Sequence, residues 1–150
     1  MKRIEAVVEI AAPATVVWAE LSAVAAYPTW NPFITRFEGE LRPGAQVEVR
    51  IAPPGGRPMT FRPTITDVQD GTRLEWLGKL LMSGIFDGRH SFHVEHIAPD
   101  RSRLTQTEEF SGVLVPLMPK TLDKARRGFD EMNEALRLRA EGAFAGPIAG

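Results

Sequence analysis

The sequence lacks cysteine, lacks long apolar runs and has almost no net charge. Its 150 residues include no cysteine, which excludes disulfides, thiolate metal sites and cysteine nucleophiles together. No apolar run approaches the ~18 residues of a membrane-spanning helix. The formal net charge of −1 argues against a nucleic-acid or anionic-membrane binder, since both classes need a basic surplus.

What is present fits one ordinary globular domain. Hydrophobic residues make up 43% of the chain and charged residues 25%, which disfavours disorder. We expect a single domain over residues 1–141 and a loose tail over 142–150, where no periodicity is left. The first residues run straight into an alternating pattern without the apolar centre of a signal peptide, so we expect a cytoplasmic protein.

Strand patterns dominate the first three quarters of the chain. Ile4, Ala6, Val8 and Ile10 alternate, which indicates a half-buried strand. Pro13 begins a short helix that ends near Ser22, and one further helical turn follows. Turn residues then separate further predicted strands at 33–40, 46–52, 59–68, a strand containing Leu74 and Trp76, 85–97 and 103–112. Adjacent hairpins without intervening helices predict an antiparallel sheet.

The last element is a long amphipathic helix. Its apolar stripe consists of Leu122, Ala125, Phe129, Met132, Leu136 and Ala140. The only large apolar partner available to this stripe is one face of the sheet. Because a twisted sheet curves and the helix is straight, we expect the two to leave a space between them.

The histidines do not predict a metal site. His90, His93 and His96 lie on a predicted strand, where His93 faces away from the other two. His90 and His96 share a face but lie about 20 Å apart, at about 3.3 Å per residue. Adjacent strand residues face opposite ways, so Glu108 and Glu109 do not form a carboxylate pair, and no nucleophile, nucleotide or zinc motif is present.

A polar group is expected inside the domain. Alternation turns His90 inward with Phe92, and it turns Gln106 and Glu108 inward on the partner strand. A buried carboxylate needs a partner, which His90 would supply. We keep three interpretations open, namely a satisfied polar core, a polar group in a ligand cavity, and a catalytic pair. A one-residue bulge would exchange Glu109 for Glu108.

Two further features carry alternatives. Gly128 lies beside the helix stripe, where either the sheet approaches closely or the missing side chain leaves room for a ligand. The uncharged stretch 113–119 would plug the core, form a dimer contact or cover a cavity mouth.

Several segments together resemble one superfamily. They are the strand from Ile4 to Pro13 leading into Val17-Trp18, then 30–33, 90–92, 106–112 and 127–136. Over residues 1–141 the chain is similar to the SRPBCC, or START-like helix-grip, superfamily, and most similar to bacterial members of the polyketide cyclase/dehydrase and lipid-transport type. The resemblance implies an α+β fold. A curved antiparallel sheet of about seven strands grips a long C-terminal helix, with two short helices after the first strand and a hydrophobic cavity between sheet and helix.

These observations predict a binding protein for a small apolar ligand that is lipid-, polyketide- or aromatic-like, in a carrier or sensor role. One alternative is a cyclase or dehydratase in which His90 works with Glu108, and another is an interaction module like the co-chaperone members. We expect no cofactor and no metal, no nucleic-acid partner, and a possible homodimer through 113–119. The predicted ligand-binding residues are Trp30, Phe33, Phe61, Trp76, Phe86, His90, Phe92, Gln106, Glu108, Phe110, Gly128, Phe129 and Met132.

Overall fold

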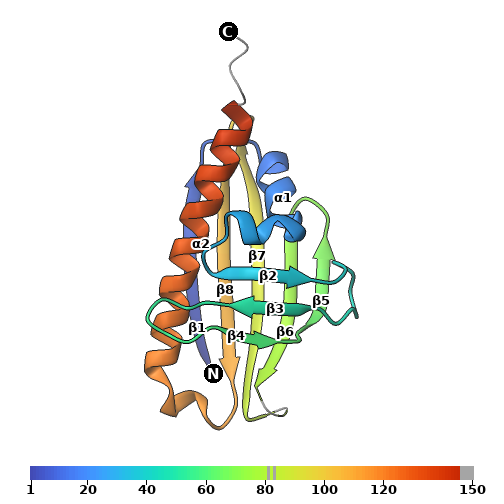
Figure 1. Cartoon of the computed structure of the whole chain (residues 1–150). Helices are drawn as coiled ribbons and strands as arrows, with labels where there is room; N and C mark the ends of the chain where they lie inside the picture. The colour runs from blue at the N-terminus through green and yellow to red at the C-terminus, as the bar shows by residue number, and fades with distance from the viewer. Residues whose placement is uncertain (81, 83, 146–150) are drawn as a thin grey trace.

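The protein consists of two antiparallel sheets and one long helix (Figure 1). The computed structural model describes residues 1–80, 82 and 84–145. The elements are β1 (Lys2–Ile10), α1 (Ala14–Ser22), the 3₁₀ helix η1 (Val24–Thr29), β2 (Ile34–Glu38), β3 (Glu48–Ile51), β4 (Met59–Phe61), β5 (Thr64–Gln69), β6 (Arg73–Leu80), β7 (Phe86–Ala98), β8 (Arg101–Ser111), the 3₁₀ helix η2 (Val115–Leu117) and α2 (Pro119–Ala145).

The larger sheet has the strand order β1-β8-β7-β6-β5, and the smaller one has the order β2-β3-β4. In Figure 1 the strands of the smaller sheet cross in front of the larger sheet, and α2 runs along the β1 edge of the same face. The helix and the smaller sheet therefore cover one face of the larger sheet between them. This arrangement confirms the predicted helix-grip fold, including the short helices after β1.

One predicted strand is wrong. The stretch 59–68 is divided into β4 and β5, which belong to different sheets. The break falls at Arg62 and Pro63, because proline has no N–H to donate to a sheet ladder. The Pro63 carbonyl accepts a hydrogen bond from the Val47 amide at 2.9 Å, which joins the two sheets at this point. The described residues thus form eight strands in two sheets, where one sheet of about seven strands was expected.

The expected C-terminal boundary also differs. Helix α2 continues to Ala145, so the first four residues of the tail expected to be loose, 142–145, are helical. The remaining part of that tail, 146–150, lies outside the described residues.

The predicted stripe of α2 forms the centre of the core. Its inward face is Leu122, Gly128, Phe129, Met132, Asn133, Leu136 and Ala140. Ala125, also predicted for the stripe, is only half-buried. The stripe therefore packs tightly from Gly128 onward and less completely in the first turns of the helix.

Gly128 makes room for an aromatic ring from another element. A Cβ at this position would overlap the Phe33 side chain. Asn31 holds that segment in place, because its Oδ1 accepts hydrogen bonds from the amides of Phe33 at 3.0 Å and Ile34 at 2.9 Å. The close approach beside Gly128 is therefore made by the ring of Phe33, directly before β2, and not by the larger sheet. This ring stacks edge-on against Phe129 and fills the space that the ligand interpretation required.

This contact predicts that two glycine-to-alanine substitutions in α2 change the free energy of unfolding in opposite directions. Gly128→Ala destabilises the protein by about 1–3 kcal/mol, because the added methyl group forces the buried Phe33 ring to move. Gly142→Ala, with open space around its Cβ, changes stability in the opposite direction, by up to about 1 kcal/mol. Urea unfolding of both variants measures the two effects. Equal stabilisation by both substitutions would contradict the contact.

Candidate functional site

Three successive inward-facing rungs of the larger sheet differ in character. In the first, Leu74, Phe92 and Gln106 are paired neighbours and are fully buried. In the second, Trp76, His90 and Glu108 lie side by side. The third rung places Gly78 opposite Gly88, which pairs with Phe110. Along its length the inner surface of the sheet therefore changes from a tightly packed rung, to a rung with polar side chains, to a bare rung, in which Gly78 and Gly88 have no side chains.

A cavity of about 220 Å³ lies over the bare rung. The larger sheet forms its floor, the β3–β4 hairpin covers it, and the start of α2 forms one side. Its lining residues are Phe33, Ile51, Pro53, Met59, Phe61, Trp76, Gly78, Lys79, Phe86, Gly88, Glu108, Phe110, Met118, Thr121 and Ala125.

The two glycines explain why the cavity forms here. Neither Gly78 nor Gly88 has a side chain to fill the space above the sheet, and glycine within a strand is typical of a close approach by another group. The two positions are not equivalent. A Cβ on Gly78 would meet only ordinary contacts, the nearest being Pro63 at 3.8 Å, whereas a Cβ on Gly88 would overlap the Glu108 carboxylate. Gly88 thus provides the space that the carboxylate occupies.

Glu108 belongs to a chain of polar side chains that runs from the cavity into the core. Its Oε1 lies 3.5 Å from His90 Nδ1. His90 Nε2 donates to Gln106 Oε1 at 2.9 Å, and Gln106 Nε2 donates to Asn133 Oδ1 on α2 at 2.8 Å. Glu108 is the only one of these four that lines the cavity. The network therefore links the cavity to the helix while keeping three of its members buried.

The direction of these hydrogen bonds constrains the ring of His90. With the amides of Gln106 and Asn133 oriented as described, His90 Nε2 carries a proton. Nδ1 is then the ring nitrogen that faces the Glu108 carboxylate, at 3.5 Å.

His90 is enclosed by aromatic rings. The centroids of Phe92 and Phe129 lie 4.7 Å from that of His90, and Trp76 lies at 4.8 Å. Its exposed fraction is 4%, and it does not line the cavity. His90 is therefore placed to act on Glu108 and does not itself touch the contents of the cavity.

Glu75 shows what a fully partnered carboxylate looks like in this sheet. It accepts hydrogen bonds from Arg89 at 2.8 Å, Thr66 at 2.9 Å and Arg73. Burial tends to raise the pKa of Glu75, but the hydrogen bonds from Arg89 and Thr66 and the charge of Arg73 outweigh it, so its pKa lies below the ordinary value. Glu108 has only His90 as a side-chain partner in the part of the chain that is described, which leaves its second oxygen available.

The predicted ligand-binding residues divide into residues that line the cavity, buried core residues, and Trp30, which belongs to neither set. Those that line the cavity are Phe33, Phe61, Trp76, Phe86, Glu108 and Phe110. Phe92, Gln106, Phe129 and Met132 are fully buried core residues, and His90 and Gly128 are also buried. Trp30 packs against Tyr27, with 5.3 Å between the two ring centroids, and Arg139 Cζ lies 5.9 Å from the centroid of the Trp30 ring. It is Glu108, and not Glu109, that faces inward.

Sequence reasoning missed most of the cavity's outer wall. The missed residues are Ile51, Pro53, Met59, Gly78, Lys79, Gly88, Met118, Thr121 and Ala125. The two glycines within β6 and β7 were the available signal, since glycine in a strand interior calls for a reason.

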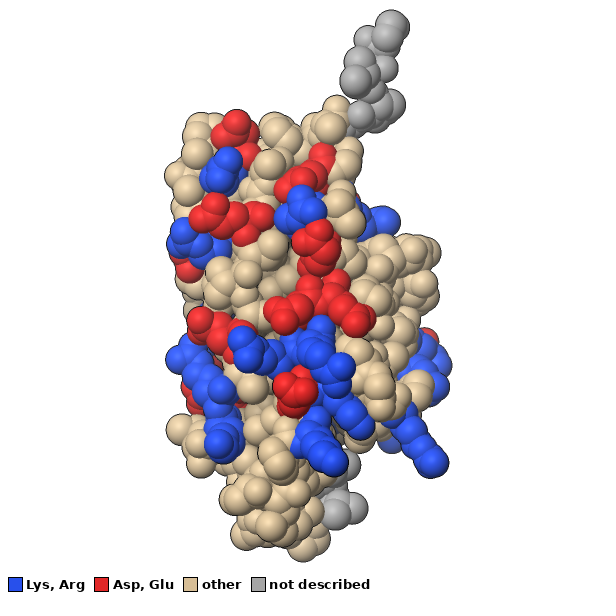
Figure 2. All heavy atoms as spheres, turned by 90° about the vertical axis from the view of Figure 1, so that its left-hand side faces the viewer, with Lys and Arg blue, Asp and Glu red and all other residues tan. Residues whose placement is uncertain are grey.

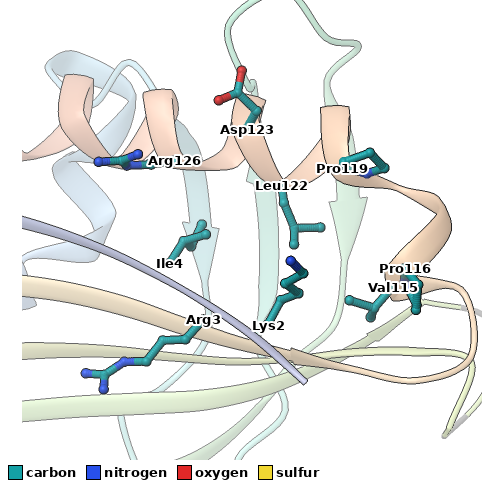
Figure 3. Close-up of a pocket in the computed structure, with 9 residues that line it drawn as sticks. All are labelled: Lys2, Arg3, Ile4, Val115, Pro116, Pro119, Leu122, Asp123 and Arg126. Carbon is teal, nitrogen blue, oxygen red and sulfur yellow. The ribbon is translucent and has the colours of Figure 1, made fainter.

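A second hollow lies outside the grip, between β1 and the start of α2. This groove has a volume of about 360 Å³. In Figure 3, Lys2 and Ile4 point from β1 toward the helix, and Leu122 points back toward them. Asp123 and Arg126 stand at its rim. The walls of this groove carry charged side chains, and the groove lies at a sheet edge. The apolar cavity is therefore the better candidate for a ligand site.

Two other features of the described chain concern site chemistry. No group of three or more histidines and carboxylates is arranged to hold a metal ion among the residues described. No helix within the described ranges combines the length and the apolar character needed to cross a membrane.

Comparison with known proteins supports the fold. The START superfamily protein from Mycobacterium smegmatis has a TM-score of 0.74 and 19% identity, with 93% of this chain and 97% of that chain covered. The Zhui aromatase/cyclase from Streptomyces sp. R1128 has a TM-score of 0.79 and 18% identity, with 99% and 98% covered. A search of curated protein sequences found no match.

A family model provides the assignment that these distant structures do not. The model described as polyketide cyclase/dehydrase and lipid transport matches residues 1–141, which includes every element from β1 to most of α2. The chain therefore belongs to the polyketide cyclase/dehydrase and lipid transport family.

Proposed function

We propose that this protein binds a small hydrophobic molecule in the cavity above Gly78 and Gly88, in a carrier or sensor role. The observation that carries the proposal is the cavity itself, an apolar space with one carboxylate facing into it. Ligand sites of this kind are lined mainly by aromatic and aliphatic side chains, with a few polar groups that set orientation.

The volume restricts the class of ligand. An apolar cavity of about 150 Å³ accepts benzene, and sites for drug-sized molecules reach about 300–1,000 Å³. At about 220 Å³ the cavity suits a compact molecule of two fused rings better than a long acyl chain or a sterol. Phe61, Trp76, Phe86 and Phe110 present rigid aromatic surfaces suited to such a ligand.

The polar wall favours a hydrogen-bond donor at one end of the ligand. Glu108 has one oxygen directed to His90, and its other oxygen lies over Gly88 in the cavity wall. A hydroxyl group on the ligand would donate to this carboxylate, while the rest of the ligand stays against apolar walls. We therefore favour phenol-like aromatic molecules over plain hydrocarbons.

The cyclase alternative is less well supported for this chain. It requires His90 to meet the substrate as an acid or base, and His90 is separated from the cavity by Glu108 and by the aromatic rings around it. The structure offers Glu108 as the one titratable group of that pair within reach of a ligand.

Filling the cavity tests the proposed site. Ala125→Leu places a larger side chain in the cavity wall and weakens binding of naphthalene by roughly tenfold or more, since the ligand and the new side chain compete for the same space. Ala135→Leu is the matched control, because Ala135 is half-buried on the same helix but does not line the cavity. Protein-observed NMR titration gives both affinities. Equal binding by the two variants would place the ligand elsewhere.

A pair of ligands tests the role of Glu108. Wild-type protein binds 2-naphthol roughly tenfold or more tightly than naphthalene, because a hydrogen bond to a charged group contributes about 1.5–3 kcal/mol. Glu108→Gln keeps the shape but leaves a neutral acceptor, and it lowers the ratio of the two affinities by roughly fivefold. The same NMR titration measures the ratio. An unchanged ratio in Glu108→Gln would show that this carboxylate does not orient the ligand.

The two facing glycines provide a second test of that geometry. Gly88→Ala displaces the Glu108 carboxylate and removes most of the preference for 2-naphthol. Gly78→Ala fits without a clash and narrows the cavity, so both affinities fall together and the preference is kept. A loss of preference in both variants alike would contradict the assignment of Gly88 as the space for the carboxylate.

A further inference from the structure

One end of the molecule combines exposed apolar side chains from two loops. Leu117 is 76% exposed, Val113 69% and Met82 68%. Backbone hydrogen bonds hold the loops together: the Val113 amide donates to the Gly84 carbonyl at 3.1 Å, and the Leu114 amide donates to the Ile85 carbonyl at 3.1 Å. We call Met82, Val113 and Leu117 the apolar end. Single exposed apolar residues are common, but a cluster of this exposure marks an interaction surface.

All four lysines of the chain lie around the apolar end. Lys2 begins β1 opposite Phe110, Lys79 lies opposite Asp87 near the end of β6, and Lys120 and Lys124 lie in the first turns of α2. None of the four forms a salt bridge within the described residues. At the far end of α2, by contrast, Arg137 and Arg139 pair with carboxylates.

The arginines and acids near this end leave a surplus of positive charge. Arg126 has no carboxylate partner in the described part of the chain, while Arg3 pairs with Glu5 at 3.0 Å and Arg127 lies 3.7 Å from Asp123. Figure 2 shows the result on the α2 and β1 side: lysine and arginine gather next to an uncharged end, and acidic side chains dominate further along. The chain's net charge of −1 hides this separation.

We propose that the apolar end and the lysines around it form a docking surface for a lipid bilayer that contains anionic lipids. Leu117, Val113 and Met82 insert between the headgroups, and the lysine ammonium groups contact the lipid phosphates. Apolar side chains surrounded by basic ones are the pattern of proteins that lie on an anionic interface. The balanced net charge argued against such a partner, but binding depends on the charge of the surface that makes contact.

A second copy of the chain fits this surface less well. In a two-fold dimer through 113–119, the apolar ends would meet, and each set of unpaired lysines would face the same set on the other copy. Lysines rarely occupy the centre of protein interfaces, whereas their long side chains reach readily from a buried stem to a headgroup. The unpaired lysines therefore favour a lipid surface over the predicted homodimer.

Docking in this orientation would bring the ligand cavity to the bilayer. Met118, which follows Leu117, lines the cavity, as do Lys79 and Phe86 on the neighbouring strands. This connection gives the docking surface a use, but docking itself is independent of the proposed ligand. It can therefore fail or succeed without deciding the proposed function.

Co-sedimentation with vesicles tests the proposal. Wild-type protein binds vesicles of phosphatidylcholine with about 30% phosphatidylserine and does not bind vesicles of phosphatidylcholine alone. Leu117→Glu abolishes binding, and Leu138→Glu, at an exposed residue toward the far end of α2, leaves it unchanged. Lys120→Glu with Lys124→Glu weakens binding at least tenfold, whereas Arg50→Glu with Arg62→Glu, two exposed arginines of the smaller sheet region, does not.

Other results would overturn the proposal. They are no binding of the wild type to anionic vesicles, equal binding by Leu117→Glu, or a wild-type dimer by light scattering that Leu117→Glu converts to a monomer. The naphthalene titration on the same Leu117→Glu sample keeps the two proposals apart, because that variant retains the cavity. Loss of vesicle binding with naphthalene binding kept supports docking. Loss of both shows that the Leu117→Glu substitution damages the fold, and the Lys120→Glu, Lys124→Glu variant is then used in its place.

Discussion

The register between β7 and β8 determines what the interior of this protein contains. It places His90 opposite Glu108 and Gly88 opposite Phe110. A one-residue shift of β7 would turn Arg89 toward the core, and a one-residue shift of β8 would turn Glu109 there. Burying an unpaired charge in either way is strongly unfavourable. The observed register therefore keeps the ion pair of Arg89 with Glu75 on the outside, holds the polar chain inside and puts the glycine of β7 beneath the carboxylate. Cavity, polar group and stability all depend on one strand pairing.

Glycine residues on α2 and on the larger sheet have opposite effects on how the core is filled. On α2, the notch at Gly128 is filled by Phe33, so helix and smaller sheet interlock at that point. On the larger sheet, the space above Gly78 is left open. At Gly128 the ring of Phe33 packs the middle of the helix tightly. Above Gly78 no side chain fills the space, so the apolar walls of the cavity lack the van der Waals contacts that a filled core would give them. A ligand that fills this space restores those contacts, which is why an open rung beside a locked one points to binding.

The parts of this structure that were predictable from sequence are those carried by local periodicity. The stripe of α2, the short helix after Pro13 and the inward alternation of His90, Gln106 and Glu108 follow from spacing along a single element. The cavity does not, because its walls come from six separate elements, β3, β4, β6, β7, β8 and α2. That Gly78 faces Gly88 follows only from the pairing of β6 with β7, and that Phe33 reaches Gly128 depends on a turn almost a hundred residues earlier in the chain. Proline is unfavourable within a strand, but the change of sheet at Pro63 also depends on where Val47 lies.

Charge shows the same difference between local and long-range information. The composition indicates a balanced protein, and each lysine taken alone is an ordinary surface residue. Only the fold brings Lys2, Lys79 and Lys120 from three distant segments to one end, where none of them forms a salt bridge within the described residues. That end is also where the first turns of α2 leave the sheet incompletely covered, because the tight packing begins at Gly128. The tightest packing is therefore in the half of α2 beyond Gly128, where Phe129, Met132 and Leu136 are fully buried. The other half carries the exposed apolar side chains and the cavity, which are the surfaces that the two proposals use.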